Sequence, residues 1–149
     1  MEICQLVKLF NARKVKYLII GASAFPAHGW ARVTLDIDFF IEPTRENAAQ
    51  TYEALAEFGY DVTDLTVDML LTKKTLFRGY IVEADIHPFV TGIQNFDALW
   101  KTRVTGTYEG EPTNYADLDS LIRMKEAAGR PKDLEDLKYL KEIKRQKTQ

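Results

Sequence analysis

Two aspartates, Asp36 and Asp38, interrupt a stretch that is otherwise apolar and ends before Pro43. Alternate residues of a strand point to the same face with Cα atoms about 6.5–7 Å apart, so both carboxylates would project together, with Ile37 and Phe39 behind them. Two carboxylates held this close repel each other, and partial burial adds a desolvation cost unless a cation lies between them. Mg²⁺, which prefers carboxylate, water and phosphate oxygens, would resolve that conflict.

A third aspartate, Asp85, lies in another alternating segment with apolar neighbours on both sides. On an adjacent strand it would complete a site for two metal ions, of the kind that stabilises phosphoryl transfer. Glu83 would share a face with Asp85 and is the alternative third acid. Two solvent-exposed acids on an edge strand would show the same spacing as Asp36 and Asp38. The pair alone therefore does not distinguish a metal-binding site from an ordinary exposed surface.

A segment of small residues, Gly21-Ala22-Ser23-Ala24, follows the first buried strand and leads into a predicted short helix. Glycine lets a ligand approach the backbone closely, and free N–H groups at the start of a helix attract phosphate. The Ser23 hydroxyl could add a hydrogen bond to a phosphate oxygen. A tight strand-to-helix turn without any ligand is the alternative interpretation of this segment.

The elements that must position these residues follow from the spacing of apolar and helix-capping residues. Strands are expected where β-forming residues run together or alternate, at 15–20, 35–41, 80–89 and, as a hairpin around Glu109-Gly110, within 104–114. Helices are expected at 3–10, 44–59, 64–71, 95–100, 117–129 and from 131 onward, with Leu134, Leu137, Leu140 and Ile143 as the buried stripe of the last. Residues 64–71 also suit a strand. The order predicts an α/β (α+β) fold, a small mixed sheet flanked by helices with helices at the C-terminus.

Composition limits the class of protein. The 149 residues, 46% hydrophobic and 28% charged, predict one globular domain over 1–149 whose core needs no disulfide or structural metal. A net charge of −2 excludes the global basicity of a protein that binds nucleic acid mainly through phosphates. The single Cys4 suits a reducing compartment. The longest stretch without a formal charge, 17–31, is too broken to span a bilayer, and the first residues lack a signal-peptide pattern, so we expect a cytoplasmic protein without membrane contact.

Taken together, several segments resemble the minimal nucleotidyltransferases of the DNA polymerase β superfamily, most nearly those related to the toxin of AbiE-type abortive-infection systems. The resemblance is carried by residues 17–24, 27–32, 34–38, 82–87, 121–125 and 129–134. Members of that superfamily pair a glycine-containing turn with D-x-D and take a third acid from a later strand, the position of Asp85. Ala22 departs from the usual Gly-Gly or Gly-Ser turn, and no added acceptor-binding domain is recognised.

The resemblance implies Mg²⁺-dependent transfer of a nucleoside monophosphate, from a nucleoside triphosphate such as ATP, to an acceptor hydroxyl. Asp36 and Asp38 would hold two Mg²⁺ ions, one of which also contacts the β- and γ-phosphates. Asp85 would hold the second ion and orient or deprotonate the attacking hydroxyl, which displaces pyrophosphate. Gly21, Ala22 and Ser23 would lie against the nucleotide.

Basic side chains should lie near such a triphosphate, because the three carboxylates already offset much of the charge of the metal ions. Arg32 is the first candidate, Lys125 the next, and Arg130 and Lys132 follow; each has a helix-surface charge as its alternative. His28 and His87 are candidate metal ligands, although hydrogen-bonded structural histidines are the favoured interpretation.

The sequence leaves the acceptor open among RNA, a protein and a small molecule, and it leaves the base open as well. The alternative function is a degenerate relative that binds a nucleotide or a partner protein, as half of a toxin–antitoxin pair, without turnover. Ala22 favours this alternative and the three acids argue against it. All of these predictions require Asp85 to lie on the same side of the sheet as Asp36 and Asp38.

Overall fold

The computed structural model of the protein describes residues 2–30 and 36–148, and their strands form one six-stranded sheet in the order β3-β4-β2-β1-β6-β5. The strands are β1 (Tyr17–Ile20), β2 (Asp36–Ile41), β3 (Thr75–Phe77), β4 (Glu83–His87), β5 (Val104–Tyr108) and β6 (Glu111–Tyr115). β2 runs parallel to β4 and antiparallel to β1, while β1 and β6 are parallel. The outer strands β3 and β5 pair antiparallel with β4 and β6. The predicted mixed sheet is confirmed.

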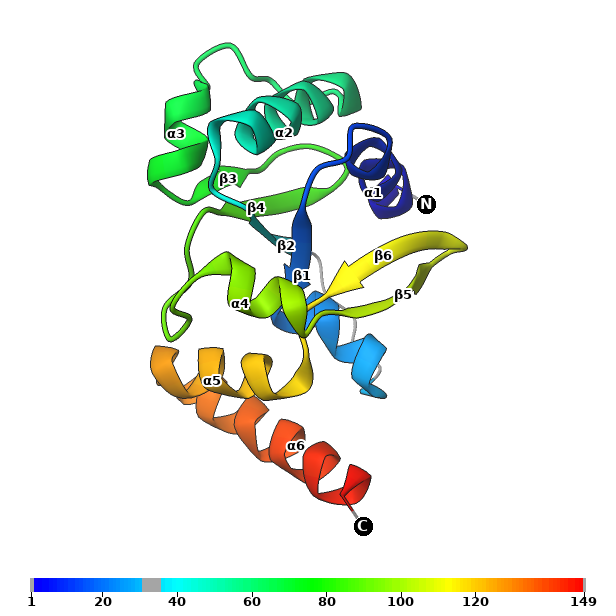
Figure 1. Ribbon diagram of the computed structural model, residues 1–149, viewed down its shortest axis with the longest axis vertical. Helices are drawn as coiled ribbons and strands as arrows, with labels where there is room; N and C mark the ends of the chain where they lie inside the picture. Colours follow the sequence, from blue (N-terminus) through cyan, green and yellow to red (C-terminus); the bar gives the residue numbers. More distant parts are fainter. Residues whose placement is uncertain (1, 31–35, 149) are drawn as a thin grey trace.

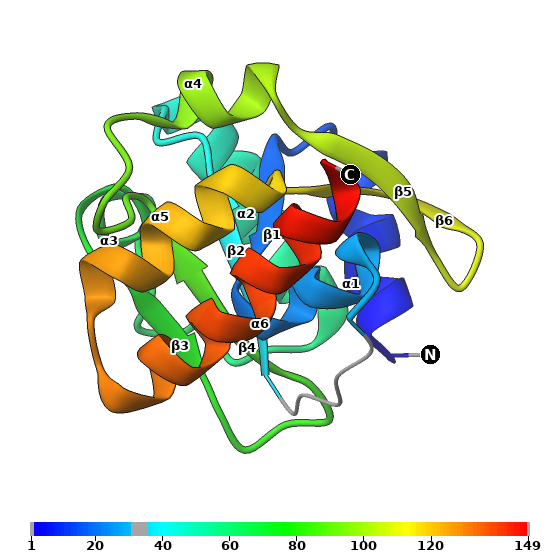
Figure 2. The same cartoon turned by 90° about the horizontal axis from the view of Figure 1, so that it is seen from below.

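Helices lie on two sides of this sheet. They are α1 (Glu2–Ala12), the 3₁₀ helix η1 (Gly21–His28), α2 (Arg45–Phe58), α3 (Val67–Thr72), α4 (Phe96–Lys101), α5 (Leu118–Ala128) and α6 (Pro131–Lys147). Figure 1 shows α1, α2 and α3 above the central strands and α4, α5 and α6 below them. Seen from below in Figure 2, α5 and α6 lie side by side in front of the sheet. The predicted α+β class, with helices at the C-terminus, is therefore confirmed.

Local capping signals set the helix boundaries. The side chains of Thr44, Asn95 and Asp117 each accept a hydrogen bond from the backbone three residues later. Gly59 and Gly129 end α2 and α5 in the left-handed conformation that glycine adopts without strain. These boundaries agree with the sequence prediction because each depends on residues within one helical turn.

The hydrophobic core extends from the first helices across β1, β2 and β4 to buried residues of α4, α5 and α6. All four residues of β1 are buried, and Phe10 of α1 packs against Tyr17 and Phe39 with ring centroids 5.6 and 4.7 Å away. Ile37 and Phe39 are buried, as expected for residues that alternate with Asp36 and Asp38. Among the described residues, no helix combines the length and apolar character needed to cross a membrane.

Three expectations about the elements need correction. β1 begins at Tyr17, and β4 covers only Glu83–His87, so the predicted strands were too long. β3 was missed, because three residues are too few to show an alternating pattern. Leu134 is 52% exposed, since the first turn of α6 buries Asp133 against α5 in place of an apolar side chain.

Candidate active site

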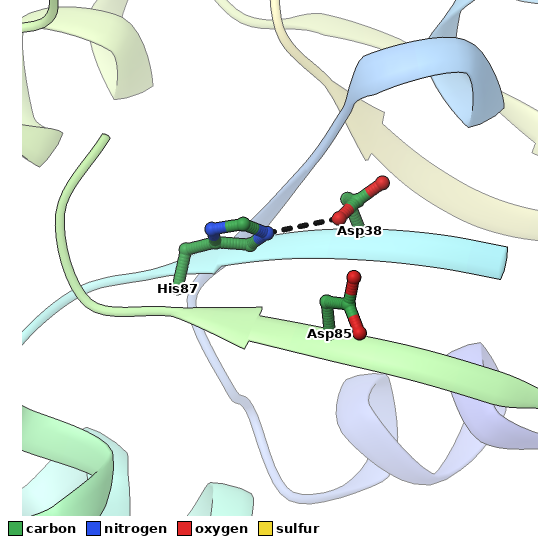
Figure 3. A group of neighbouring side chains, drawn as sticks. All are labelled: Asp38, Asp85 and His87. Atoms are coloured by element: carbon green, nitrogen blue, oxygen red, sulfur yellow. Dashed lines mark hydrogen bonds and ion pairs between the residues drawn. The ribbon is translucent and has the colours of Figure 1, made fainter. Parts of the chain in front are cut away.

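The aspartates of β2 and β4 meet because the two strands are parallel and in register. Asp38 lies opposite Asp85, and Asp36 lies opposite Glu83. Residues paired in this way point to the same face of a sheet. Figure 3 shows the carboxylates of Asp38 and Asp85 on neighbouring strands, on one side of both. The geometric condition set by the sequence analysis is therefore met.

Asp38, Asp85 and His87 form one group of side chains with metal-ligand chemistry. One potential ligand atom from each lies within 4.8 Å of the other two. His87 Nε2 is 2.9 Å from Asp38 Oδ1, and the Asp85 side chain is only 7% exposed. Asp36 lies on the same strand as Asp38 and lines the adjoining cleft, but it is not a member of this group. The structure thus gives a histidine, rather than Asp36, as the third member.

Cations from the β3 end of the sheet compensate the buried charge of Asp85. Arg78 Nη1 is 2.7 Å from Asp85 Oδ1, and Lys74 Nζ is 3.9 Å from Asp85 Oδ2. Arg78 also contacts Glu83, with Nε 3.6 Å from Oε2, and its hydrogen bond to Asp85 raises the pKa of Arg78. The cation that the crowded carboxylates require is therefore supplied by the protein itself in this structure.

The glycine turn sits directly against Asp38. Gly21 has φ +66°, and a Cβ atom placed there would lie 3.0 Å from Asp38 Oδ2. The positive φ favours glycine at this position, and a Cβ atom there would require the Asp38 carboxylate to shift by a few tenths of an ångström. Ala22 lines the cleft beside it, whereas the Ser23 hydroxyl donates a 2.9 Å hydrogen bond to the backbone oxygen of Asp36. That bond ties the start of η1 to the start of β2.

A cleft of about 440 Å³ lies between the carboxylate face and the C-terminal helices. Its sheet side includes Asp36, Asp38, Lys74 and His87, and its other lining residues are Ile20, Gly21, Ala22, Phe89, Val90, Thr91, Leu121, Met124, Lys125, Ala128, Arg130, Lys132 and Asp133. A larger hollow of about 840 Å³ lies beside α1 and α2, but its lining includes none of the grouped ligands. The smaller cleft is therefore the candidate site.

The far wall of the cleft contains a second set of charges. Lys125 Nζ lies 3.2 Å from Asp133 Oδ1 and 3.2 Å from Asp136 Oδ2. Arg130 Nε is 2.6 Å from Asp133 Oδ2, and this hydrogen bond, with help from Lys125, lowers the pKa of Asp133 to about 2. Lys125 is thus held by two aspartates, and its contact with a nucleotide stays a prediction.

The remaining predicted residues fall in different places. Arg32 lies outside the described residues. His28 is buried with its Nε2 2.9 Å from the oxygen of Ala116, and burial lowers its pKa, which agrees with a structural histidine. His87 differs, because it belongs to the ligand group.

Sequence reasoning missed Lys74, Arg78 and Phe89. Lys74 and Arg78 flank β3, whose Leu76 pairs with Asp85. Recognising the short run Thr75-Leu76-Phe77 as a strand would have placed both cations beside the third acid. Phe89, which is 62% exposed at the cleft, follows β4 by two residues and gave no signal of its own.

No family model matches the sequence, and no curated protein matches it. Among solved structures, the chain is similar to the lincosamide antibiotic adenylyltransferase LnuA in its lincomycin-bound crystal structure. The two are 17% identical and superpose with a TM-score of 0.66 over 95% of this chain and 96% of that one. A relation to AbiE-type proteins is not among these findings. The chain therefore has the fold of a nucleotidyltransferase, along nearly its whole length.

Proposed function

We propose that the protein is a divalent-metal-dependent nucleotidyltransferase that moves a nucleoside monophosphate from a nucleoside triphosphate to an acceptor hydroxyl. The observation that carries the proposal is the pairing of Asp38 with Asp85, on one face of parallel strands, beside the Gly21 turn and at a cleft. The fold shared with an adenylyltransferase supports nucleotide chemistry for the chain.

The donor set fits Mg²⁺ as the metal. Asp36, Asp38 and Asp85 supply hard carboxylate oxygens, and the half-exposed cations Arg78 and Lys74 that now offset the charge of Asp85 could give way to a metal ion. When bound, the metal ions would neutralise the triphosphate and favour departure of pyrophosphate. Asp36 and Asp38 would hold both ions, and Asp85 would hold the second after its ion pair with Arg78 opens.

The chain's own residues position the reaction. Asp85 orients the acceptor hydroxyl or accepts its proton, so that the hydroxyl oxygen bonds to the α-phosphorus while the bond to the pyrophosphate oxygen breaks. Gly21, Ala22 and Ser23 would lie against the phosphates through their backbone, and the cleft cation Lys74 would offset phosphate charge, together with Arg32 as the sequence predicts. Lys125 also lines the cleft, but its two aspartate partners assign it to the stability of the helical wall. No protein side chain needs to form a covalent intermediate, because positioning and charge neutralisation would supply the rate.

A small molecule that carries a hydroxyl group is the acceptor class that we favour. The structural neighbour is an antibiotic adenylyltransferase crystallised with lincomycin, which supports both ATP as the donor and a small acceptor. The net charge of −2 gives no general affinity for an RNA acceptor.

The test is to incubate the protein with ATP labelled at the α-phosphate, Mg²⁺ and a panel of hydroxyl-bearing small molecules. Release of pyrophosphate together with label on an acceptor supports the proposal, and the Asp85→Asn protein should give neither. Parallel reactions with RNA and with a cell lysate identify another acceptor. Labelled product that is equally abundant with Asp85→Asn would refute the assigned chemistry.

The alternative is a module that binds nucleotide or a partner protein, such as an antitoxin, without turnover. It is favoured by the ion pair between Arg78 and Asp85, which already satisfies the third acid, and by Ala22 in the glycine turn. Its signature is a melting temperature raised by ATP and Mg²⁺ with no label transferred to any acceptor. No shift at millimolar concentrations of both ligands would count against the transferase and against the nucleotide-binding module, and would leave binding of a partner protein as the alternative.

A further inference from the structure

We infer that His87 is a direct metal ligand, so that the subsite formed by Asp38, Asp85 and His87 prefers a transition-metal ion such as Mn²⁺ or Co²⁺ to Mg²⁺. The inference deepens the proposed function and rests on it for the presence of metal in the cleft. It divides the metal site into an oxygen-only subsite at Asp36 and Asp38 and a mixed nitrogen and oxygen subsite.

The position of His87 is set by the sheet. His87 follows Asp85 by two residues on β4, so both side chains leave the same face. Figure 3 shows the imidazole reaching from β4 towards Asp38 on β2, with Nε2 2.9 Å from Oδ1. Metal–ligand bonds of about 2.0–2.2 Å place ligand atoms roughly 3–4 Å apart. The group, within 4.8 Å, needs only small side-chain adjustments to reach that spacing.

The side chains around the subsite differ in solvent exposure, which determines which of them would move away when a metal ion binds. Arg78 and Lys74 are 42% and 52% exposed, so either can leave Asp85 for solvent when a metal ion arrives. The His87 side chain is only 15% exposed and projects from a paired strand. The imidazole nitrogen therefore remains beside the Asp38 oxygen that an incoming ion would bind.

The donor atoms then determine which ion is preferred. Imidazole nitrogen suits Mn²⁺, Co²⁺ and Zn²⁺ better than Mg²⁺, which takes an almost complete shell of oxygens. Binding requires the neutral ring with its free electron pair on Nε2 and its proton on Nδ1. When an ion binds, the proton that Nε2 donates to Asp38 would pass to solvent, the ring would keep or take up its proton on Nδ1, and the hydrogen bond would be exchanged for two bonds to one ion.

The first test measures binding of Mg²⁺ and of Co²⁺ alone, without nucleotide, by calorimetry to the full-length protein and to His87→Asn and His87→Ala. The amide of the asparagine variant keeps a hydrogen-bond donor near Asp38 but is a poor ligand for a transition metal. We expect Co²⁺ affinity to fall about tenfold or more in both variants while Mg²⁺ affinity changes less than about twofold. Equal losses for the two metals, or Co²⁺ binding that His87→Asn leaves intact, would overturn direct ligation and leave a positioning role.

The second test is spectroscopic. Pulsed electron paramagnetic resonance of the Mn²⁺-loaded protein should detect an imidazole nitrogen coupled to the ion, and that coupling should disappear in His87→Asn. Circular dichroism verifies that each variant is folded. If His87→Ala does not fold, the comparison is made with His87→Asn alone. Because neither measurement involves nucleotide or turnover, a missing nitrogen signal refutes ligation by His87, whereas absent transferase activity with the signal present refutes only the proposed function.

Discussion

The two walls of the cleft both hold aspartates paired with cations, but they differ in how the cations are held. On the helical wall, Asp133 is fully buried between two cations, Lys125, which is only 13% exposed, and Arg130, which is 67% exposed. On the sheet side, Asp85 lies next to the cleft as the strand partner of the lining residue Asp38 and is nearly as buried as Asp133, yet its partners Arg78 and Lys74 are about half exposed. The aspartate of the helical wall therefore keeps one buried cation, Lys125, whereas both cations beside Asp85 are exposed enough to exchange.

Desolvation explains the difference. A buried lysine that left its aspartates would leave uncompensated charges on both sides, which costs several kcal/mol. An arginine with its guanidinium near solvent regains hydration when it leaves, so a divalent ion can replace it at little cost. We therefore assign the helical wall to stability and the sheet wall to chemistry, and four measurements test that division.

The largest expected effect is on activity, from Asp85→Asn. Loss of the carboxylate should lower nucleotidyl transfer by about 10³-fold or more, equivalent to roughly 4 kcal/mol of transition-state stabilisation. The free energy of unfolding should change little, because Arg78 and Lys74 are about half exposed and regain hydration once Asp85 is neutral. Glu83→Gln, a neighbouring acid on the same strand, is the matched control and should retain transfer within about threefold. Transfer lost with Glu83→Gln but retained with Asp85→Asn would make Glu83 the third acid instead.

For Asp133→Asn we expect a loss of stability as the main effect, in contrast to the loss of activity expected for Asp85→Asn. Removing one partner of the buried network should lower the free energy of unfolding by about 3 kcal/mol, because Lys125 loses half of its compensation. Urea denaturation measures this change, with Asp85→Asn as the comparison. If the two variants lost equal stability, the assignment of different roles to the two walls would be wrong.

Ionisation of Asp133 on the helical wall should also make the stability depend on pH, an effect smaller than that of Asp133→Asn itself. The pKa of Asp133 is lowered from 3.8 to about 2 in the folded protein, mainly by the Arg130 hydrogen bond. As the pH falls, the carboxyl group of Asp133 is protonated in the unfolded chain before it is protonated in the folded protein. The contribution of Asp133 to the free energy of unfolding is therefore complete above about pH 4 and is lost as the pH falls towards 2. The stability difference between the wild-type protein and Asp133→Asn should shrink over that interval in urea titrations. A constant difference would show that ionisation of Asp133 contributes nothing.

The smallest effect is expected for Arg78→Ala. Removing an exposed cation that competes for Asp85 should tighten binding of Mg²⁺ alone by about two- to fivefold, the equivalent of an exposed ion pair. Arg78→Lys keeps the competing charge and should bind Mg²⁺ like the wild-type protein in calorimetry. Weaker metal binding by Arg78→Ala would instead mean that Arg78 supports the metal-bound arrangement.

The sequence determined the features that depend on near neighbours. The helix caps at Thr44, Asn95 and Asp117 and the turn at Glu109-Gly110 were predictable because each is satisfied within a few residues. The common face of Asp36 and Asp38 follows from the two-residue period of a strand. The choice of Asp85 as third acid came from a family resemblance, which periodicity alone did not provide.

Only the tertiary structure decided which distant groups meet. The register of β2 against β4 sets Asp38 opposite Asp85 and brings His87 to Asp38, and the pairing of β3 with β4 adds Arg78. The packing of α6 on α5 buries Asp133 with Lys125 and exposes Leu134, against the apolar pattern. Strand order and helix packing result from the whole core, so the chemistry of individual residues was visible in the sequence while their partners were not.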